Sequence, residues 1–266
     1  MSPTTIPGKM TLSGKMTLRQ TWQPMDSDAA AYITAVETAD GQALEEKVKI
    51  AIDNFVLGCK ADGIWSAVKA SCILAGARTL AGALVPLVGT APTNFNFVSG
   101  DYNRETGLVS DGSTKYLDSN RNNNTDPQNS KHVAIYASTL VGGNIFNSGT
   151  GGIAGRVGLT SDGFVSCNHN TGIFKQEAAP AVAFTGISRG NSSNYIYRTN
   201  SSNATVVFNS GAPNNGNILF YARPGTPPDS YTTSRLAFYS IGESLDLALL
   251  DARVTDLINA FGVAIP

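Results

Sequence analysis

The 266-residue sequence carries little charge. Charged residues make up 15% of it, and 19 basic residues nearly balance 20 acidic ones. Such a chain lacks the basic surface that neutralises phosphates, so we expect no nucleic-acid partner. Hydrophobic residues make up 42% and the formal net charge is −1, which excludes an acidic disordered chain. The sequence instead predicts a folded protein whose surface is rich in Asn, Ser, Thr and Gly.

Cysteine and long hydrophobic runs are also scarce. The three cysteines, Cys59, Cys72 and Cys167, are widely spaced and odd in number, which argues against a disulfide framework or a CxxC zinc site. We expect buried free thiols. The most apolar stretch, residues 72–88, is interrupted by glycine, arginine and proline, and the first residues hold no signal-peptide core. The sequence therefore predicts neither secretion nor membrane insertion.

Residues 1–25 form a segment of distinct composition. They hold two copies of one pentapeptide, Gly8–Leu12 and Gly14–Leu18, each reading Gly-Lys-Met-Thr-Leu. Glycine turns between short alternating segments predict extended chain, and nothing in it can bury a core by itself. We interpret residues 1–25 as an anchoring arm that becomes ordered against a partner or another copy.

Residues 26–90 predict a small helical subdomain. A first helix follows the N-capping residues Asp26–Asp28 and ends at Gly41, and a second, amphipathic helix covers residues 44–58. A third helix is expected after Asp62, and a short fourth one ends at Pro86. The apolar stripe assigned to the third helix consists of Ile64, Trp65, Val68, Cys72 and Ile73.

Residues 91–266 have the pattern of a β domain closed by a C-terminal helix. Short apolar runs are separated by clusters of Gly, Asn, Ser and Pro; they cover residues 131–137, 195–197, 205–208, 217–222 and 235–241. This pattern predicts an antiparallel β-sandwich of the jelly-roll type. A final helix is expected from a cap at Ser244 to Gly262. The predicted class is mainly β with α.

Three stretches resemble sequences of tailed-phage and prophage virion proteins. They are residues 55–65 (FVLGCKADGIW), 108–117 (LVSDGSTKYL) and 238–245 (FYSIGESL). The resemblance extends over roughly residues 40–262. It implies a helical lead-in, a concanavalin-A-like or LamG-like jelly roll and a C-terminal helix, in a structural or adhesion component of the tail fibre, tail tip or baseplate. It supplies no catalytic residues.

Two motifs suggest chemistry at single residues. Residues 186–190 fit the G-x-S-x-G pattern around a nucleophilic serine, Ser188, but the sequence after it is poor at starting a helix. We expect a β-turn there and no catalysis. Asp111, Asp118 and Asp126 lie in polar loop-like sequence and are candidate calcium ligands, although the segment from Asp118 lacks the glycine and glutamate of an EF-hand. A solvated, Asn-rich loop is the alternative interpretation.

Sugar binding needs aromatic faces and neutral hydrogen-bonding groups. Four tyrosines lie among Asn and Ser residues and are candidates for glycan contact, the alternative being that they pack in the core: Tyr195, Tyr197, Tyr221 and Tyr231. Glycoside hydrolysis would need two carboxylates at a fixed separation, and only Glu105, Glu177 and Glu243 are available as glutamates in the β half. We predict a protein that is not an enzyme and needs no cofactor, calcium excepted.

These observations predict a virion protein that is assembled in the host bacterial cytoplasm. Its partners are other virion proteins, reached through the arm, and further copies of itself in a homo-oligomer. A host-surface glycan is the expected ligand if the jelly roll serves in attachment. The alternatives are a capsid decoration or head-fibre protein and, with less support, a polysaccharide-degrading enzyme.

Overall fold

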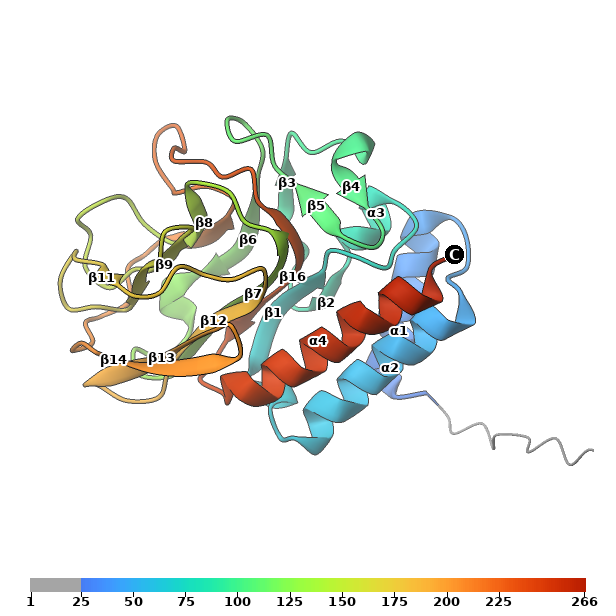
Figure 1. The fold of residues 1–266 in the computed structure, drawn as a ribbon, viewed down its shortest axis with the longest axis horizontal. Helices are drawn as coiled ribbons and strands as arrows, with labels where there is room; N and C mark the ends of the chain where they lie inside the picture. The colour runs from blue at the N-terminus through green and yellow to red at the C-terminus, as the bar shows by residue number, and fades with distance from the viewer. Residues whose placement is uncertain (1–24) are drawn as a thin grey trace, which may run out of the picture.

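Two antiparallel β-sheets packed face to face, with helices on one side, make up residues 25–266, the part of the chain that the computed structural model describes (Figure 1). The predicted class, mainly β with α in an antiparallel sandwich, is confirmed. The predicted arm, residues 1–25, lies outside the described residues apart from Met25.

The first sheet has nine strands. Its order is β14 (Ser202–Val207), β13 (Asn194–Thr199), β12 (Ala183–Arg189), β7 (Lys131–Thr139), β16 (Arg235–Gly242), β1 (Val68–Ile73) and β2 (Pro86–Val88). Two short strands, β4 (Tyr102–Asn103) and β5 (Gly107–Val109), extend it, with β5 paired to β16. Strand β16 pairs with β7 on one side and with β1 on the other. The last strand of the chain thus lies beside β1, the strand that follows α1 and α2 in the sequence.

The second sheet has seven strands. Its order is β11 (Lys175–Gln176), β10 (Phe164–Cys167), β9 (Val157–Thr160), β8 (Asn144–Asn147), β15 (Asn217–Phe220), β6 (Tyr116–Asn122) and β3 (Thr93–Phe95). All its pairings are antiparallel.

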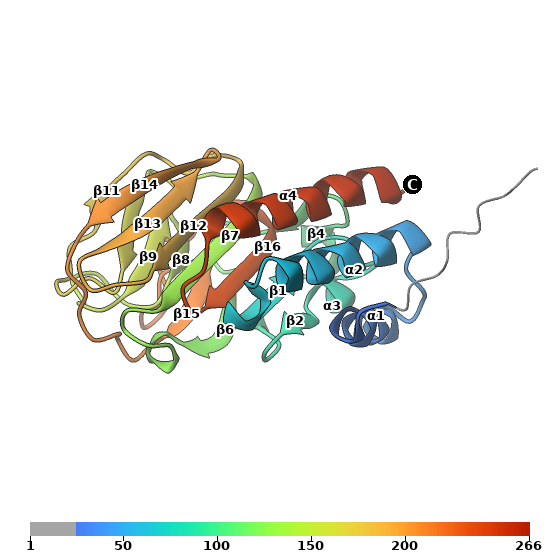
Figure 2. The same ribbon diagram turned by 90° about the horizontal axis from the view of Figure 1, so that it is seen from below.

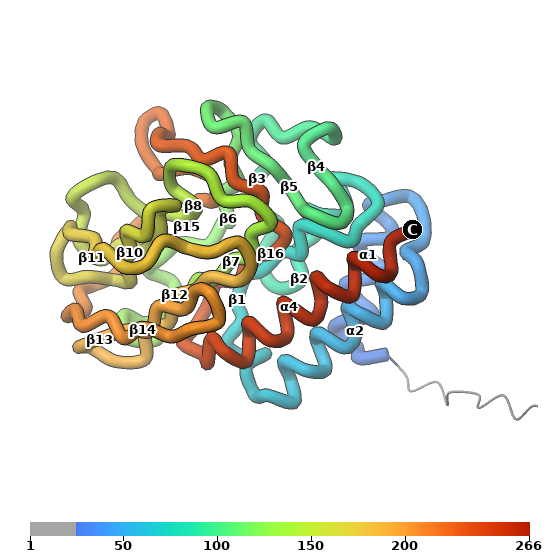
Figure 3. Tube along the Cα trace, viewed as in Figure 1, coloured from blue at the N-terminus to red at the C-terminus, as the bar shows by residue number. Residues whose placement is uncertain are grey.

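Three long helices pack on the nine-stranded sheet. They are α1 (Ser27–Asp40), α2 (Glu46–Ala61) and α4 (Leu247–Ala264), with a short α3 (Leu80–Ala83) beside them. Asp26 caps α1 as predicted, and Gly41 ends it in the left-handed conformation. Figure 2 shows α2 and α4 side by side along the strands. The chain ends on this helical side, away from β9–β11 (Figure 3).

Two hydrophobic cores result, one on each face of the nine-stranded sheet. In β7, Val133 and Ile135 point between the two sheets, whereas Ala134 points towards the helices. Because both faces of this sheet are covered, its central strands are buried almost throughout. No helix packs on the outer face of the seven-stranded sheet in the described chain, although β8 in its middle is buried throughout.

Three local predictions are wrong. The residues expected to form a third helix make a 3₁₀ turn, Trp65–Ala67, followed by β1, so two strands lie within the segment 26–90 that was predicted to be helical. The segment around Ser188 lies in β12 and is no turn. The last helix is capped by Asp246, not Ser244, and continues past Gly262 to Ala264.

Other predictions are confirmed. The five apolar runs coincide with β7, β13, β14, β15 and β16. All three cysteines are buried free thiols, and burial raises the pKa of Cys59 and Cys72 to about 12. Within residues 25–266, no helix has the length and apolar character needed to cross a bilayer.

Candidate functional site

The outer face of the seven-stranded sheet is the surface that the helices leave uncovered. Strand pairing aligns one row of residues across this face: Thr93, Asp118, Leu219, Asn147, Gly158 and Ser166. Alternate residues of the same strands, such as Leu117 and Leu159, point inward to the core between the sheets. Leu219, Asn147 and Ser166 of this row are nonetheless buried, so loops and side chains of the described chain cover the middle of this face and leave its edges more open.

An aromatic patch, formed by Phe95, Tyr116 and Tyr231, lies at one edge of this face. Phe95 and Tyr116 are direct partners on β3 and β6, and their rings stack with centroids 4.2 Å apart. The Tyr231 ring lies at 59° to that of Tyr116, with centroids 6.3 Å apart. All three side chains are partly exposed. Phe95 and Tyr116 lie on paired strands and Tyr231 on a loop, and together they offer the ring faces outside the stack and two phenolic hydroxyls.

A hollow of about 540 Å³ lies further along the same side of the sheet, near the turn between β9 and β10. Phe164, which is 40% exposed, and Phe174 line it. The polar lining comes from residues around β8 and β9 and from the chain after β15, including Asn144, Thr160, Asp162 and Ser230. The backbone nitrogen of Asn144 donates to the Ser230 carbonyl at 2.9 Å, which ties the wall of the hollow to the segment that carries Tyr231.

Two arginines also line this hollow. Arg156 is 4% exposed, and its guanidinium carbon lies 3.9 Å from the centre of the Phe174 ring. Phe174 in turn covers Gly158, where an added Cβ would lie 2.8 Å from the ring. Arg223 is more exposed and makes a two-pronged pair with Asp229, at 2.7 and 3.0 Å.

Burial and neighbouring charge lower the pKa of Arg156 to about 10. Burial is the main cause, and the positive charge of Arg223 adds to it. Burial likewise lowers the pKa of His169 to about 4; Arg189, Arg156 and Lys175 reinforce the shift, while the hydrogen bond to the Ile173 carbonyl opposes it. Positive charge thus gathers at this end of the sandwich.

Three of the four predicted tyrosines lie in the core. Tyr195 and Tyr197 are 1% exposed and Tyr221 is fully buried, so none offers a ring face to an external sugar. Their hydroxyls have internal partners: Tyr195 contacts His169 Nε2, Tyr197 donates to the Ala178 carbonyl and Tyr221 to the Leu108 carbonyl. Of the four predicted tyrosines, Tyr231 alone is partly exposed. Its neighbours Phe95 and Tyr116 were not predicted from the sequence.

The three aspartates proposed for calcium do not form a metal site. Within residues 25–266 no group of three or more His, Cys, Asp or Glu side chains is arranged for a metal. Asp118 accepts from the Asn120 backbone and the Asn217 amide, and Asp126 pairs with Lys131.

The Asp111 carboxylate is likewise hydrogen-bonded within its own loop. It accepts hydrogen bonds from the Ser113, Thr114 and Lys115 backbone nitrogens and from the Thr114 hydroxyl. Burial opposes the effect, but these hydrogen bonds hold the pKa of Asp111 well below its usual range. The carboxylate is thus stabilised without a cation.

The residues considered for catalysis are far apart in the topology. Glu105 lies in the turn between β4 and β5, Glu177 follows β11, and Glu243 follows β16, where it pairs with Lys69. The Ser188 hydroxyl donates to the Leu245 carbonyl at 2.8 Å and accepts from its backbone nitrogen at 3.1 Å. Ser188 therefore links β12 to the start of α4.

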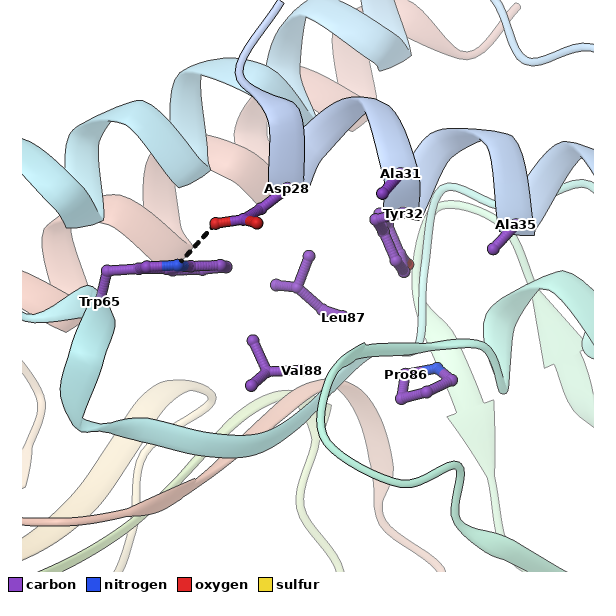
Figure 4. A pocket seen from close by; sticks show the side chains of 8 residues that line it. All are labelled: Asp28, Ala31, Tyr32, Ala35, Trp65, Pro86, Leu87 and Val88. Atoms are coloured by element: carbon purple, nitrogen blue, oxygen red, sulfur yellow. Dashed lines mark hydrogen bonds between the residues drawn. The ribbon is translucent and has the colours of Figure 1, made fainter.

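A second hollow, of about 370 Å³, lies on the helical side between α1 and β2 (Figure 4). The Trp65 indole nitrogen donates to Asp28 at 3.1 Å, and Ala31, Ala35, Leu87 and Val88 supply apolar walls. Lys60, the nearest cation, is already paired with Asp26 and Asp28. Asp28, Trp65 and the nearby Lys60 are thus all engaged with partners inside the protein.

No protein-family profile matches the chain, and no curated protein matches it. Solved structures with a similar fold include the botulinum neurotoxin serotype C1 binding domain, with a TM-score of 0.43 and 14% identity over 72% of this chain and 52% of that one. A second is a mutant Trypanosoma rangeli sialidase displaying trans-sialidase activity, with a TM-score of 0.40 and 10% identity over 79% and 39%.

A third is domain 4 of a GH43 extracellular arabinanase from Geobacillus stearothermophilus in complex with arabinotriose, with a TM-score of 0.34 and 11% identity over 55% of this chain and 80% of that one. Of the botulinum neurotoxin DC binding domain solved in complex with SialylT, the chain covers 41%. These scores describe a distant likeness of fold.

Proposed function

We propose that this protein is a non-catalytic attachment component of a tailed-phage particle, which binds host-surface glycans through the outer face of its seven-stranded sheet. The aromatic patch of Phe95, Tyr116 and Tyr231 carries the proposal, because partly exposed rings on a rigid sheet suit the apolar faces of sugars. The polar hollow beside it supplies amide and hydroxyl groups. The virion context rests on the three sequence stretches quoted above.

The placement of the two ends of the fold supports this proposal. The described chain begins and ends on the helical side, whereas β9–β11 and the hollow lie at the other end (Figures 1 and 3). The arm that we propose as the anchor extends to Met25, at the end of the described chain that lies opposite the hollow. A particle could hold the protein by the arm and leave the outer face of the seven-stranded sheet free.

Replacing Tyr116 by alanine should weaken glycan binding about fivefold. The change removes one ring of the patch and leaves Phe95 without its stacking partner; such aromatic contacts are worth about 1 kcal/mol or more. The measurement is binding of the full chain to an array of bacterial surface polysaccharides, followed by titration of the best ligand. Trp65→Ala, an aromatic change on the helical side, is the matched control and should bind normally. Equal affinities for wild type and Tyr116→Ala, or no ligand on the array, would refute the proposal.

Deletion of residues 1–24 should leave a folded protein that fails to join particles. The two hydrophobic cores are built from residues beyond this segment, so circular dichroism and thermal unfolding should match those of the full chain. Incorporation is measured by complementing a phage that lacks the protein and probing purified particles with antibody. Normal incorporation of the truncated protein would contradict the anchoring role, and electron microscopy of labelled particles would separate a tail position from a capsid one.

A further inference from the structure

Arg156 is a buried positive charge with an incomplete set of partners. Its two terminal nitrogens donate to the carbonyls of Thr150 and Gly172, at 2.8 and 3.0 Å. Its Nε is buried and has no hydrogen-bond partner among the described residues, and no carboxylate in that part of the chain lies within ion-pair distance of it. A buried donor left in this way costs free energy, which a ligand acceptor would recover.

Arg189 shows that this fold can satisfy a buried arginine completely. Arg189 is fully buried and also has no ion-pair partner in residues 25–266, yet Nε, Nη1 and Nη2 all donate to backbone carbonyls. Among the arginines of residues 25–266, only Arg156 combines an unpartnered Nε with a place in the wall of a hollow. The difference indicates that the surroundings of Arg156 are complete only when something else is bound.

Arg223 supplies a second, accessible cation in the same hollow. Its Nε and Nη2 are engaged by Asp229, whose side chain is 51% exposed. Nη1 lies near Gly151, where an added Cβ would be 3.5 Å from it, and makes no hydrogen bond within the described chain. An anion that enters the hollow can therefore contact Arg223 directly, while Arg156 holds a fixed positive charge behind it.

We infer that this hollow binds an anionic group, a carboxylate or a phosphate, carried by a sugar of an acidic glycan. The inference rests on the proposed function and adds a ligand class to it. Guanidinium groups suit both anions, because their planar donors match two oxygen atoms at once. Phe164 on the rim provides an exposed ring for the sugar, and the one carboxylate that the described residues place in the wall, that of Asp162, accepts a hydrogen bond from the Thr160 hydroxyl.

The decisive probes are small sugars that differ in charge. Full-length protein with ¹⁵N label would be titrated with glucuronate, glucose 1-phosphate, glucose and inorganic phosphate, and the arginine Nε–H signals followed by NMR. We expect the signals of Arg156 and Arg223 to shift with the two acidic sugars and to stay in place with glucose. The affinity for the acidic sugars should fall as salt is added.

Arg223→Gln should weaken acidic-sugar binding at least tenfold and leave folding unchanged. Arg253→Gln is the matched control, since Arg253 makes the same two-pronged pair with Asp62, at 2.7 and 3.0 Å, on the helical side. It should bind like wild type. Arg156→Lys keeps the charge but loses the flat group over Phe174, so an intermediate affinity is expected. If that variant fails to fold, the Arg223 variant and the wild-type titrations still test the inference.

Each result separates this inference from the proposed function. Equal shifts with glucose and glucuronate would overturn the anion preference, while a Tyr116-dependent ligand on the array would leave the attachment role in place. Inorganic phosphate that binds as tightly as glucose 1-phosphate would reveal an adventitious ion only and overturn the glycan assignment. Arginine signals that no sugar moves would overturn the inference whatever the array shows.

Discussion

Replacing Asp126 by asparagine should destabilise the protein by about 3–5 kcal/mol, the range for breaking one side of a buried ion pair. Asp126 is 3% exposed and Lys131 is fully buried, with Lys131 Nζ 2.6 Å from the Asp126 carboxylate. Burial alone would raise the pKa of Asp126, but Arg121 and Lys131 outweigh it and lower that pKa. Without the carboxylate, Lys131 must stay charged and unpaired or give up its proton, and both cost free energy.

Urea unfolding at pH 7 measures this loss of stability. Two further variants show whether the unpaired Lys131 causes it. Asp126→Asn combined with Lys131→Met should recover part of the stability, because the fully buried Lys131 charge is gone and only the partly exposed Arg121 still lacks its partner. Asp229→Asn removes a carboxylate from the exposed pair with Arg223 and should cost less than about 1 kcal/mol. A double variant no more stable than Asp126→Asn alone would show that the unpaired Lys131 is not the cause.

The mispredicted strand β1 shows where sequence patterns are ambiguous. Its residues, Val68–Ile73, are buried almost continuously, because the helices cover one face of the nine-stranded sheet and the second sheet covers the other. A strand buried on both faces has no alternation, and a short apolar run of this kind fits a helical stripe equally well. Strand β6, next to the edge strand β3, is partly exposed and keeps a visible alternation.

The tyrosines were misplaced for a related reason. In β13, Tyr195 and Tyr197 face the core between the sheets, whereas Ile196 and Arg198 face the helical side. Arg198 pairs there with Asp251 of α4, at 2.8 Å. Both sides of β13 thus bury residues, and the alternation alone does not say which side meets solvent.

The aromatic patch could not be predicted from the sequence. Phe95 and Tyr116 meet because β3 pairs with β6 in one register, and Tyr231 arrives from a loop more than one hundred residues later. Composition did predict that the surface of the β half is polar and weakly charged. The cations Arg156, Arg189 and Lys175, scattered in sequence, gather only through the folded topology.

Lowering the pH from 7 to 4.5 should destabilise the protein by several kcal/mol through its two histidines. His132 is fully buried, and burial lowers its pKa to about 4; the hydrogen bond to the Glu243 carbonyl opposes that shift. Because a carbonyl only accepts, His132 Nδ1, 2.6 Å from it, carries the proton, and Nε2 accepts from the Ser240 hydroxyl. His169 is arranged alike between the Ile173 carbonyl and the Tyr195 hydroxyl, and its pKa is also about 4.

In the unfolded chain both histidines take up protons near pH 6.5, whereas in the folded chain they do so only near pH 4. Between these values the unfolded state binds more protons, so stability is complete above about pH 6.5, falls as the pH is lowered and is lost near pH 4. Each histidine contributes on the order of 3 kcal/mol. Urea midpoints at pH 7, 5.5 and 4.5 measure the effect, and His132→Asn should flatten the slope by about half. A wild-type midpoint that is equal at pH 7 and 4.5 would contradict the neutral, buried state of these two side chains.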